Sequence, residues 1–146
     1  MKPSFSPGVG PGNPSQVYLY ALDVADGKLF IGGLLADQGA FAYDGTTVSH
    51  IGVLGDWIRT FDEFGGEVIA GGFNPLLGKW NGTTSWTSLN GSWDAFCGTV
   101  HDLQVHNGLL IAAGAFGGPA CPPNGYLITW DGSNWSTLGL GMDNTI

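Results

Sequence analysis

The side chains that could perform acid–base or nucleophilic chemistry are few in this chain. One cluster combines histidine with a carboxylate: His101, Asp102 and His106. If this segment is a strand, alternation places residues 101 and 106 on opposite faces, so they would not share a site. The sequence has no Gly-x-Ser-x-Gly turn, phosphate-binding loop or His-Glu-x-x-His pair. No motif therefore indicates an enzyme, although a carboxylate pair for glycoside hydrolysis that meets only in the fold stays open.

Aspartates recur near the ends of the segments that we expect to be strands. Asp23, Asp62 and Asp102 occupy similar places along the chain. A ring of such carboxylates could bind calcium through several oxygens. However, the chain lacks an Asp-x-Asp-x-Asp-Gly loop, and aspartate commonly caps turns and solvates surfaces. We therefore expect no cofactor, with calcium as the alternative.

Two tryptophans suggest a binding site for carbohydrate. Trp57 and Trp93 precede apolar segments, where loops would reach the surface of the fold. A tryptophan offers a flat apolar ring with one polar group, and carboxylates can accept hydrogen bonds from sugar hydroxyls. Trp57, Trp93, Asp62 and Asp102 are thus the candidate ligand-binding residues, while packing inside the fold is the alternative for both tryptophans.

Modification sites are a further chemical feature. Three Asn-x-Ser/Thr sequences begin at Asn81, Asn90 and Asn134, all near expected turns, and are candidates for glycosylation. Because Gly, Ser, Thr and Asn are abundant, chance occurrence is the alternative. The two cysteines, Cys97 and Cys121, form either a disulfide that holds an insertion in place or two unrelated thiols.

A repeat of about 40 residues predicts the elements that position these side chains. Residues 22–33 are echoed by 61–72 and by 103–114. Turn dipeptides such as Asp26-Gly27 favour type I′ hairpins, which need positive φ at both central residues. We expect three units of four strands each, at about 17–24, 28–34, 39–43 and 47–51; 57–63, 67–73, 77–80 and 84–89; and 99–105, 109–115, 125–130 and 134–138.

Units of four strands at this period are typical of β-propeller blades. The pairs Gly32-Gly33 and Gly71-Gly72 resemble the diglycine of kelch repeats, and the pairs Trp80…Trp86 and Trp130…Trp135 resemble the kelch aromatic pair. The chain is similar to kelch-like, Trp-Asp-Gly-containing repeats of secreted bacterial propellers, a resemblance that covers nearly everything after residue 16. It departs from kelch in a shorter period, in Tyr43…Val48 and in Ala113-Gly114, so the resemblance implies a fold more than a function.

The expected organisation is an arm followed by blades. Residues 1–16 are rich in Pro and Gly and are expected to be an extended arm that ties neighbouring subunits together. Residues 17–146 form an all-β, propeller-type array of three antiparallel blades, at about 17–53, 54–92 and 93–141, with a short lead-in after them. Since closed propellers have about four to eight blades, three would make half of a ring or an open arc.

Composition restricts the partners. The 146 residues carry 4 Lys and Arg against 12 Asp and Glu, a net charge of −8, with only 11% charged residues. A nucleic-acid partner would need a basic surface, and no apolar run is long enough for membrane insertion. We expect a secreted, extracellular or cell-surface structural protein, non-enzymatic, that assembles with itself into a ring or filament. The alternatives are a glycan-binding propeller and a fragment of a larger secreted propeller enzyme.

Overall fold

The computed structural model describes residues 18–34, 39–54, 57–73, 77–89, 98–116 and 125–138. All regular structure within these ranges is β, in twelve strands without a helix. No helix in the described part of the chain could span a membrane. Several predictions fall outside the described residues: the arm 1–16, the candidate site residue Trp93, the sequon at Asn90 and the proposed link between Cys97 and Cys121.

The strands form three separate four-stranded antiparallel sheets, each made of strands consecutive in the chain. Sheet 1 contains β1 (Tyr18–Ala25), β2 (Lys28–Leu34), β3 (Phe41–Tyr43) and β4 (Val48–His50). Sheet 2 contains β5 (Trp57–Phe64), β6 (Glu67–Phe73), β7 (Leu77–Trp80) and β8 (Trp86–Ser88). Sheet 3 contains β9 (Gly98–His106), β10 (Leu109–Phe116), β11 (Gly125–Trp130) and β12 (Trp135–Thr137). The predicted all-β class and all twelve strands are confirmed.

Tight hairpins connect the first two strands of each sheet. Asp26 and Gly27 have φ values of 48° and 67°, and Asn107 and Gly108 have values of 50° and 75°. Two successive residues with positive φ give the turn that matches the twist of the flanking strands. The Asx and Gly residues at these positions therefore explain why the chain reverses here.

Each first strand carries a β-bulge at the same place. The register between the first and second strands shifts between Leu19 and Ala21 in β1 and between Ile58 and Thr60 in β5, and β9 shifts equivalently against β10. The extra residues are Tyr20, Arg59 and His101. Because the bulge falls at the same position in all three first strands, each residue of one sheet has a defined counterpart in the other two.

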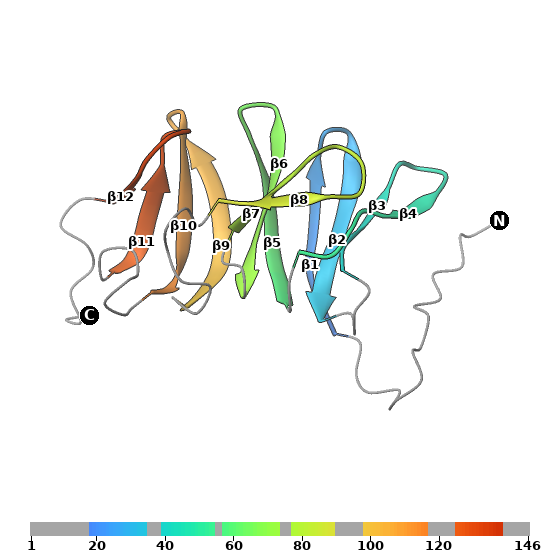
Figure 1. Cartoon of the computed structure of the whole chain (residues 1–146), viewed down its shortest axis with the longest axis horizontal. Coiled ribbons are helices and arrows are strands. Elements are labelled where there is room, and N and C mark those ends of the chain that lie inside the picture. The colour runs from blue at the N-terminus through green and yellow to red at the C-terminus, as the bar shows by residue number, and fades with distance from the viewer. Residues whose placement is uncertain are drawn as a thin grey trace.

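The sheets pack face to face, with sheet 2 between sheets 1 and 3 (Figure 1). Between sheets 1 and 2, the ring centroid of Phe30 lies 5.6 Å from that of Phe61 and 5.4 Å from that of Trp80. A second cluster fills the space between sheets 2 and 3 and contains Ile69, Leu77, Val100, Leu103, Leu110 and Ile128. One sheet alone could not bury these side chains, so the neighbouring sheets stabilise one another.

The diglycine of each second strand allows two close approaches. A Cβ at Gly32 would lie 2.6 Å from Cγ2 of Ile58, in the next sheet, and a Cβ at Gly71 would lie 2.6 Å from Cγ1 of Val100. A Cβ at the second glycine, Gly33 or Gly72, would collide with a backbone carbonyl of the first strand in its own sheet. The first glycine thus serves packing between sheets and the second serves pairing within one.

Candidate functional site

The clearest anomaly in the described structure is an exposed apolar face on sheet 1. We define the outer face of sheet 1 as the side that points away from sheet 2. On β1 it presents Leu19, Leu22 and Val24, which are 51%, 62% and 73% exposed. Large apolar side chains gathered in this way commonly mark an interaction surface.

Two of these three positions are buried in the other two sheets, whereas Val24 corresponds to the exposed Glu63 and the half-buried Val105. The register equates Leu19 with Ile58 and Val100, and Leu22 with Phe61 and Leu103. Their exposed fractions are 3% for Ile58, 0% for Val100, 1% for Phe61 and 5% for Leu103. In sheets 2 and 3 the preceding sheet covers these side chains, and sheet 1 has no preceding sheet among the described residues.

The second strands show the same contrast. Leu29 and Ile31 of β2 are only half-buried. Their counterparts Val68 and Ala70 in β6 are 3% and 0% exposed, and the equivalent positions in β10 are fully buried. The outer face of sheet 1 therefore has the residue types of an interface between sheets, but none of the three described sheets packs on it.

The outer face of sheet 3, which points away from sheet 2, has a different character. It includes the exposed Asp102 and Gln104 on β9 and the half-buried Ile111 and Ala113 on β10. The register equates these four with residues of sheet 2 that receive sheet 3, namely Thr60, Asp62, Ile69 and Gly71. The outer face of sheet 1 thus resembles the side of sheets 2 and 3 that packs on the preceding sheet. The outer face of sheet 3 resembles the side of sheet 2 that packs on the following sheet.

Polar contacts accompany the apolar packing between sheets. The carboxylate of Asp62 accepts a hydrogen bond from the backbone N–H of Val105 at 2.8 Å. The hydroxyl of Thr60 accepts one from the N–H of Leu103 at 3.3 Å. These N–H groups belong to β9, the edge strand of sheet 3, and would lack a backbone partner on that side. The side chains of sheet 2 therefore satisfy the edge of sheet 3.

A hydrogen bond from a tryptophan indole recurs at the fourth strand of sheets 2 and 3. Nε1 of Trp86 donates to the carbonyl oxygen of Ile51 at 2.9 Å, and Nε1 of Trp135 donates to that of Leu89 at 3.1 Å. Each links the fourth strand of one sheet to the residue that follows the previous sheet. Val48 takes the equivalent place in sheet 1 and has no donor in its side chain.

Acidic side chains lie on neighbouring first strands. Burial raises the pKa of the Asp23 carboxyl, and the negative charges of Asp62 and Asp102 raise it further, against a backbone hydrogen bond from Val24 that lowers it. A bound calcium would lower such a pKa instead. Within the described ranges, no three His, Cys, Asp or Glu side chains lie close enough to hold a metal ion.

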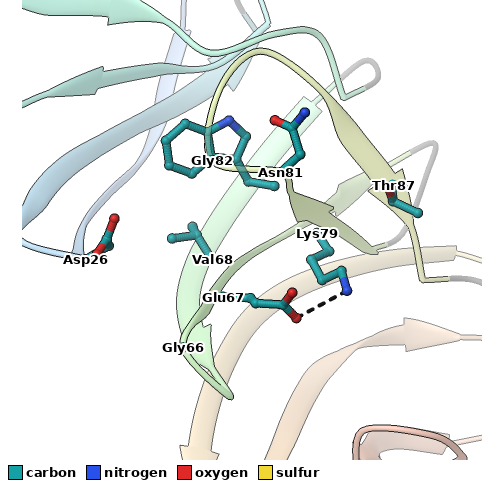
Figure 2. Close-up of a pocket in the computed structure, with 9 residues that line it drawn as sticks. Asp26, Gly66, Glu67, Val68, Lys79, Asn81, Gly82 and Thr87 are labelled. Atoms are coloured by element: carbon teal, nitrogen blue, oxygen red, sulfur yellow. Dashed lines mark ion pairs between the residues drawn. The ribbon is translucent and has the colours of Figure 1, made fainter.

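A pocket of about 350 Å³ with a mixed polar and apolar lining opens beside Trp80. Its lining residues come from the β1–β2 and β5–β6 turns and from the β7–β8 hairpin, and they are Asp26, Gly66, Glu67, Val68, Lys79, Trp80, Asn81, Gly82 and Thr87. Figure 2 shows Lys79 and Glu67 pointing toward each other, in an ion pair of 3.2 Å. Trp80 is only 8% exposed, so its ring offers little surface for a ligand to stack on.

Among the candidate ligand-binding residues that the structure describes, Trp57 lies apart from Asp62 and Asp102. Trp57 and Asp62 lie at opposite ends of β5, five residues and thus about 16 Å apart along the strand. The Trp57 ring is 38% exposed and contacts Phe73, with ring centroids 5.6 Å apart. Asp102 lies on β9, where its carboxylate accepts a hydrogen bond from Thr60. Trp57 is therefore separated from the row of aspartates.

Two candidate glycosylation sites fall within the described residues. Asn81 and Asn134 are both exposed, as attachment of a glycan requires. The side-chain oxygen of Asn81 accepts hydrogen bonds from the backbone N–H of Thr83 at 2.9 Å and from its hydroxyl at 3.0 Å. This Asx turn orders the sequon at the tip of a hairpin.

Sequence reasoning singled out His101 only as part of a His/carboxylate cluster, and it did not identify Tyr20, Arg59 or His101 as bulge residues. The guanidinium of Arg59 lies over the ring of Tyr20, 5.3 Å from its centroid. Bulges often re-aim a side chain, but the only sequence signal for them is one extra residue in each first strand. Sequence reasoning expected exposed blade faces at the ends of the array but did not name Leu19 and Leu22, although the repeat alignment alone pairs them with Ile58 and Phe61.

The chain has no match among known protein families and none among curated proteins. Its function must therefore be inferred from the two end faces and the contacts between the sheets.

Proposed function

We propose that this protein is a non-enzymatic structural or interaction protein that assembles with itself through its exposed end faces into a ring or a filament. The three sheets act as propeller-type blades in this proposal, and the kelch-like diglycines and aromatic pairs support that arrangement. The low share of charged residues, 11%, and the turn sequons support an extracellular or cell-surface location.

The observation that carries the proposal is the contrast between equivalent positions. Leu22 is 62% exposed, whereas Phe61 and Leu103 are 1% and 5% exposed. Covering a leucine-sized side chain contributes about 1.5–3 kcal/mol. Several such positions lie together on the outer face of sheet 1, so its burial against another subunit would be strongly favourable. The two end faces differ, so the contact is head-to-tail and forms either a closed ring or an open filament.

Light scattering on a size-exclusion column, over a range of protein concentrations, tests this function. A particle of about twice the chain mass of 15.2 kDa would support a closed ring of two copies. Large particles of mixed size would support a filament. A chain that stays monomeric at every concentration would contradict self-assembly.

A second candidate function is carbohydrate binding, favoured by the exposure of Trp57 and by the pocket beside Trp80. A glycan array with the wild-type protein, Trp57→Ala and Asn81→Ala would test it. Binding lost in Trp57→Ala would indicate the predicted site, and binding lost in Asn81→Ala would indicate the pocket. Absence of binding to any glycan would count against this candidate.

A further inference from the structure

We propose that the outer face of sheet 1 packs on the outer face of sheet 3 of a second copy, in the same register as the interfaces inside the chain, so that Leu19 lies against Ala113 of that copy. This inference rests on the proposed self-assembly and specifies its contact. The occupant of the exposed face is then another copy of this chain, which carries both of the required faces.

The register follows from two interfaces that the structure already contains. In each, the first residue of the diglycine position receives a side chain from the next first strand: Gly32 receives Ile58 and Gly71 receives Val100. The equivalent residue on sheet 3 is Ala113, and the equivalent incoming residue on sheet 1 is Leu19. Continuing the pattern past sheet 3 therefore brings Leu19 of a second copy to Ala113.

The pair Leu19 and Ala113 differs from the two internal pairs at both positions, and the two differences compensate for each other sterically. Where the receiving residue is glycine, the incoming residue is β-branched, and the nearest atoms to an added Cβ are a γ-methyl of Ile58 or Val100, at 2.6 Å. Where the receiving residue is Ala113, which has a Cβ, the incoming Leu19 has one γ-carbon instead of two. A single γ-carbon can rotate away from the alanine methyl. This matching supports a contact between the two ends of the same sequence.

The polar groups of sheet 3 resemble those that sheet 2 presents at its interface with sheet 3, although between sheets 1 and 2 the place of Thr60 is taken by Ala21. Inside the chain, Thr60 and Asp62 accept hydrogen bonds from the N–H groups of Leu103 and Val105. At the junction between copies, Asp102 and Gln104 take the places of Thr60 and Asp62. Leu22 and Val24 of the second copy supply the equivalent N–H groups from the edge strand β1. Oδ1 of Asp102 already accepts from Thr60 and Leu103 within its own copy, and the Val24 N–H already donates to Asp23 at 3.2 Å. The acceptors offered to the edge of β1 are therefore the second oxygen of Asp102 and the amide oxygen of Gln104.

One feature of the internal interfaces is missing at this junction. Val48 stands where Trp86 and Trp135 donate their indole hydrogen bonds, so no indole reaches the carbonyl of Leu138. The junction between copies should therefore be weaker than the interfaces within a copy. We expect reversible association that depends on protein concentration.

Charge substitution on the exposed face tests the contact. Leu22→Asp should raise the dissociation constant of self-association about tenfold or more, measured by analytical ultracentrifugation, because it removes an apolar side chain from the junction. Leu22 is exposed in a single copy, so the circular dichroism spectrum should not change. Val53→Asp is the matched control, since Val53 is similarly exposed (58%) but lies after sheet 1, in the segment that leads to sheet 2.

Cysteine crosslinking tests the register itself. Under mild oxidation, Leu19→Cys combined with Ala113→Cys should link separate copies, and mass spectrometry should find peptides joined through positions 19 and 113. Val24→Cys with Ala113→Cys is the out-of-register control, because position 24 lies about 16 Å further along β1. Crosslinking of the control as efficiently as of the in-register pair would overturn the register.

The outcomes separate this inference from the proposed function. If the wild-type protein associates and Leu22→Asp weakens association while Val53→Asp does not, both stand. If the wild-type protein associates and Leu22→Asp has no effect, self-assembly stands and this contact is wrong. If the wild-type protein is monomeric at every concentration, both are wrong, and the face belongs to a different partner.

Discussion

The indole of Trp86 donates its hydrogen bond to the carbonyl oxygen of Ile51 at 2.9 Å, which joins the last strand of sheet 2 to the residue just after sheet 1. Trp135 and Leu89 repeat this relationship at 3.1 Å. Trp86 also contacts Phe61, with ring centroids 6.3 Å apart. The repeated tryptophan therefore does two things at once: it fills space between sheets and satisfies a backbone group at their outer end.

We predict that Trp86→Phe lowers the free energy of unfolding by about 1–2 kcal/mol, because it keeps an aromatic ring but leaves the Ile51 carbonyl without its indole donor. Trp135→Phe should cost a similar amount for the same reason. Val48→Ile is the control, since no indole bond exists at that position. Urea denaturation followed by circular dichroism measures all three, and a loss below about 0.3 kcal/mol in both Trp variants would contradict the prediction.

The diglycine leads to a second prediction. Gly72→Ala should lower the free energy of unfolding by about 1–3 kcal/mol or more, because its Cβ would collide with the backbone carbonyl of Trp57, which cannot rotate away as a side chain can. Ala113→Gly, at the first position of this motif in sheet 3, is the comparison for an exchange without a collision and should cost only about 0.5–1 kcal/mol, through backbone entropy. Thermal melts of both variants measure the difference, and an equal cost would show that β5 can shift to accommodate the methyl group.

A third prediction concerns the carboxylate that bridges sheets 2 and 3. Asp62 accepts hydrogen bonds from the N–H of Glu63 at 2.7 Å and of Val105 at 2.8 Å, one on each oxygen. In Asp62→Asn, one oxygen is replaced by an amide donor, so one N–H loses its acceptor. We expect a loss of about 1–2 kcal/mol in the free energy of unfolding.

Hydrogen exchange locates the effect of that substitution. Protection of the Val105 amide should fall in Asp62→Asn by more than that of amides inside the β10–β11 ladder. A uniform fall across all amides would mean that the substitution acts on global stability and not on this bridge.

The strands were predictable because their signal is local and repeated. Turn pairs such as Asp26-Gly27 mark the hairpins, and all twelve predicted strands are present with ends within two residues of those observed. The repeat amplifies the signal, since a weak segment such as Val48–His50 is identified by its better-defined counterpart Trp86–Ser88.

The roles of individual side chains were much less predictable. Sequence patterns placed Asp62 among the candidate ligand-binding residues, but its bond to Val105 depends on which strand lies at the edge of sheet 3, a non-local fact. The separation of Trp57 from the aspartates depends likewise on their spacing along β5 and on how the sheets stack. The asymmetry between Leu22 and Phe61 arises because no described sheet covers the outer face of sheet 1, and which residues lie on that face depends on the register and the bulge of β1.

The last prediction concerns pH. Burial and the charges of Asp62 and Asp102 raise the pKa of the Asp23 carboxyl above its ordinary value of 3.8. The folded protein then holds this proton more tightly than the unfolded chain does. The stability that Asp23 contributes is therefore fully present below about pH 3.8 and is lost as the pH rises through the raised pKa.

Asp23→Asn removes this titration, so the free energy of unfolding of the variant, relative to the wild type, should increase as the pH rises from about 3.8 and then level off. Asp44→Asn is the contrasting variant. Hydrogen bonds from the N–H groups of Thr47 and Thr46, each 2.8 Å, lower the pKa of the Asp44 carboxyl. Its stabilisation is present above pH 3.8 and lost as the pH falls through the lowered pKa, so this variant should fall behind the wild type as the pH rises.

Urea denaturation at intervals of half a pH unit between pH 3 and 7 measures the free energy of unfolding of both variants relative to the wild type. It thereby shows whether this difference rises or falls with pH. Asn81 makes the comparison sharper, because it holds the equivalent turn of sheet 2 with a neutral amide that accepts from the N–H of Thr83 at 2.9 Å. An asparagine at position 44 should therefore keep the turn and lose only the charge. If Asp23→Asn and Asp44→Asn shifted the stability profile in the same direction, burial and repulsion would not be what sets the Asp23 pKa. Opposite slopes would establish that the charge of Asp23 opposes folding at neutral pH while the charge of Asp44 favours it.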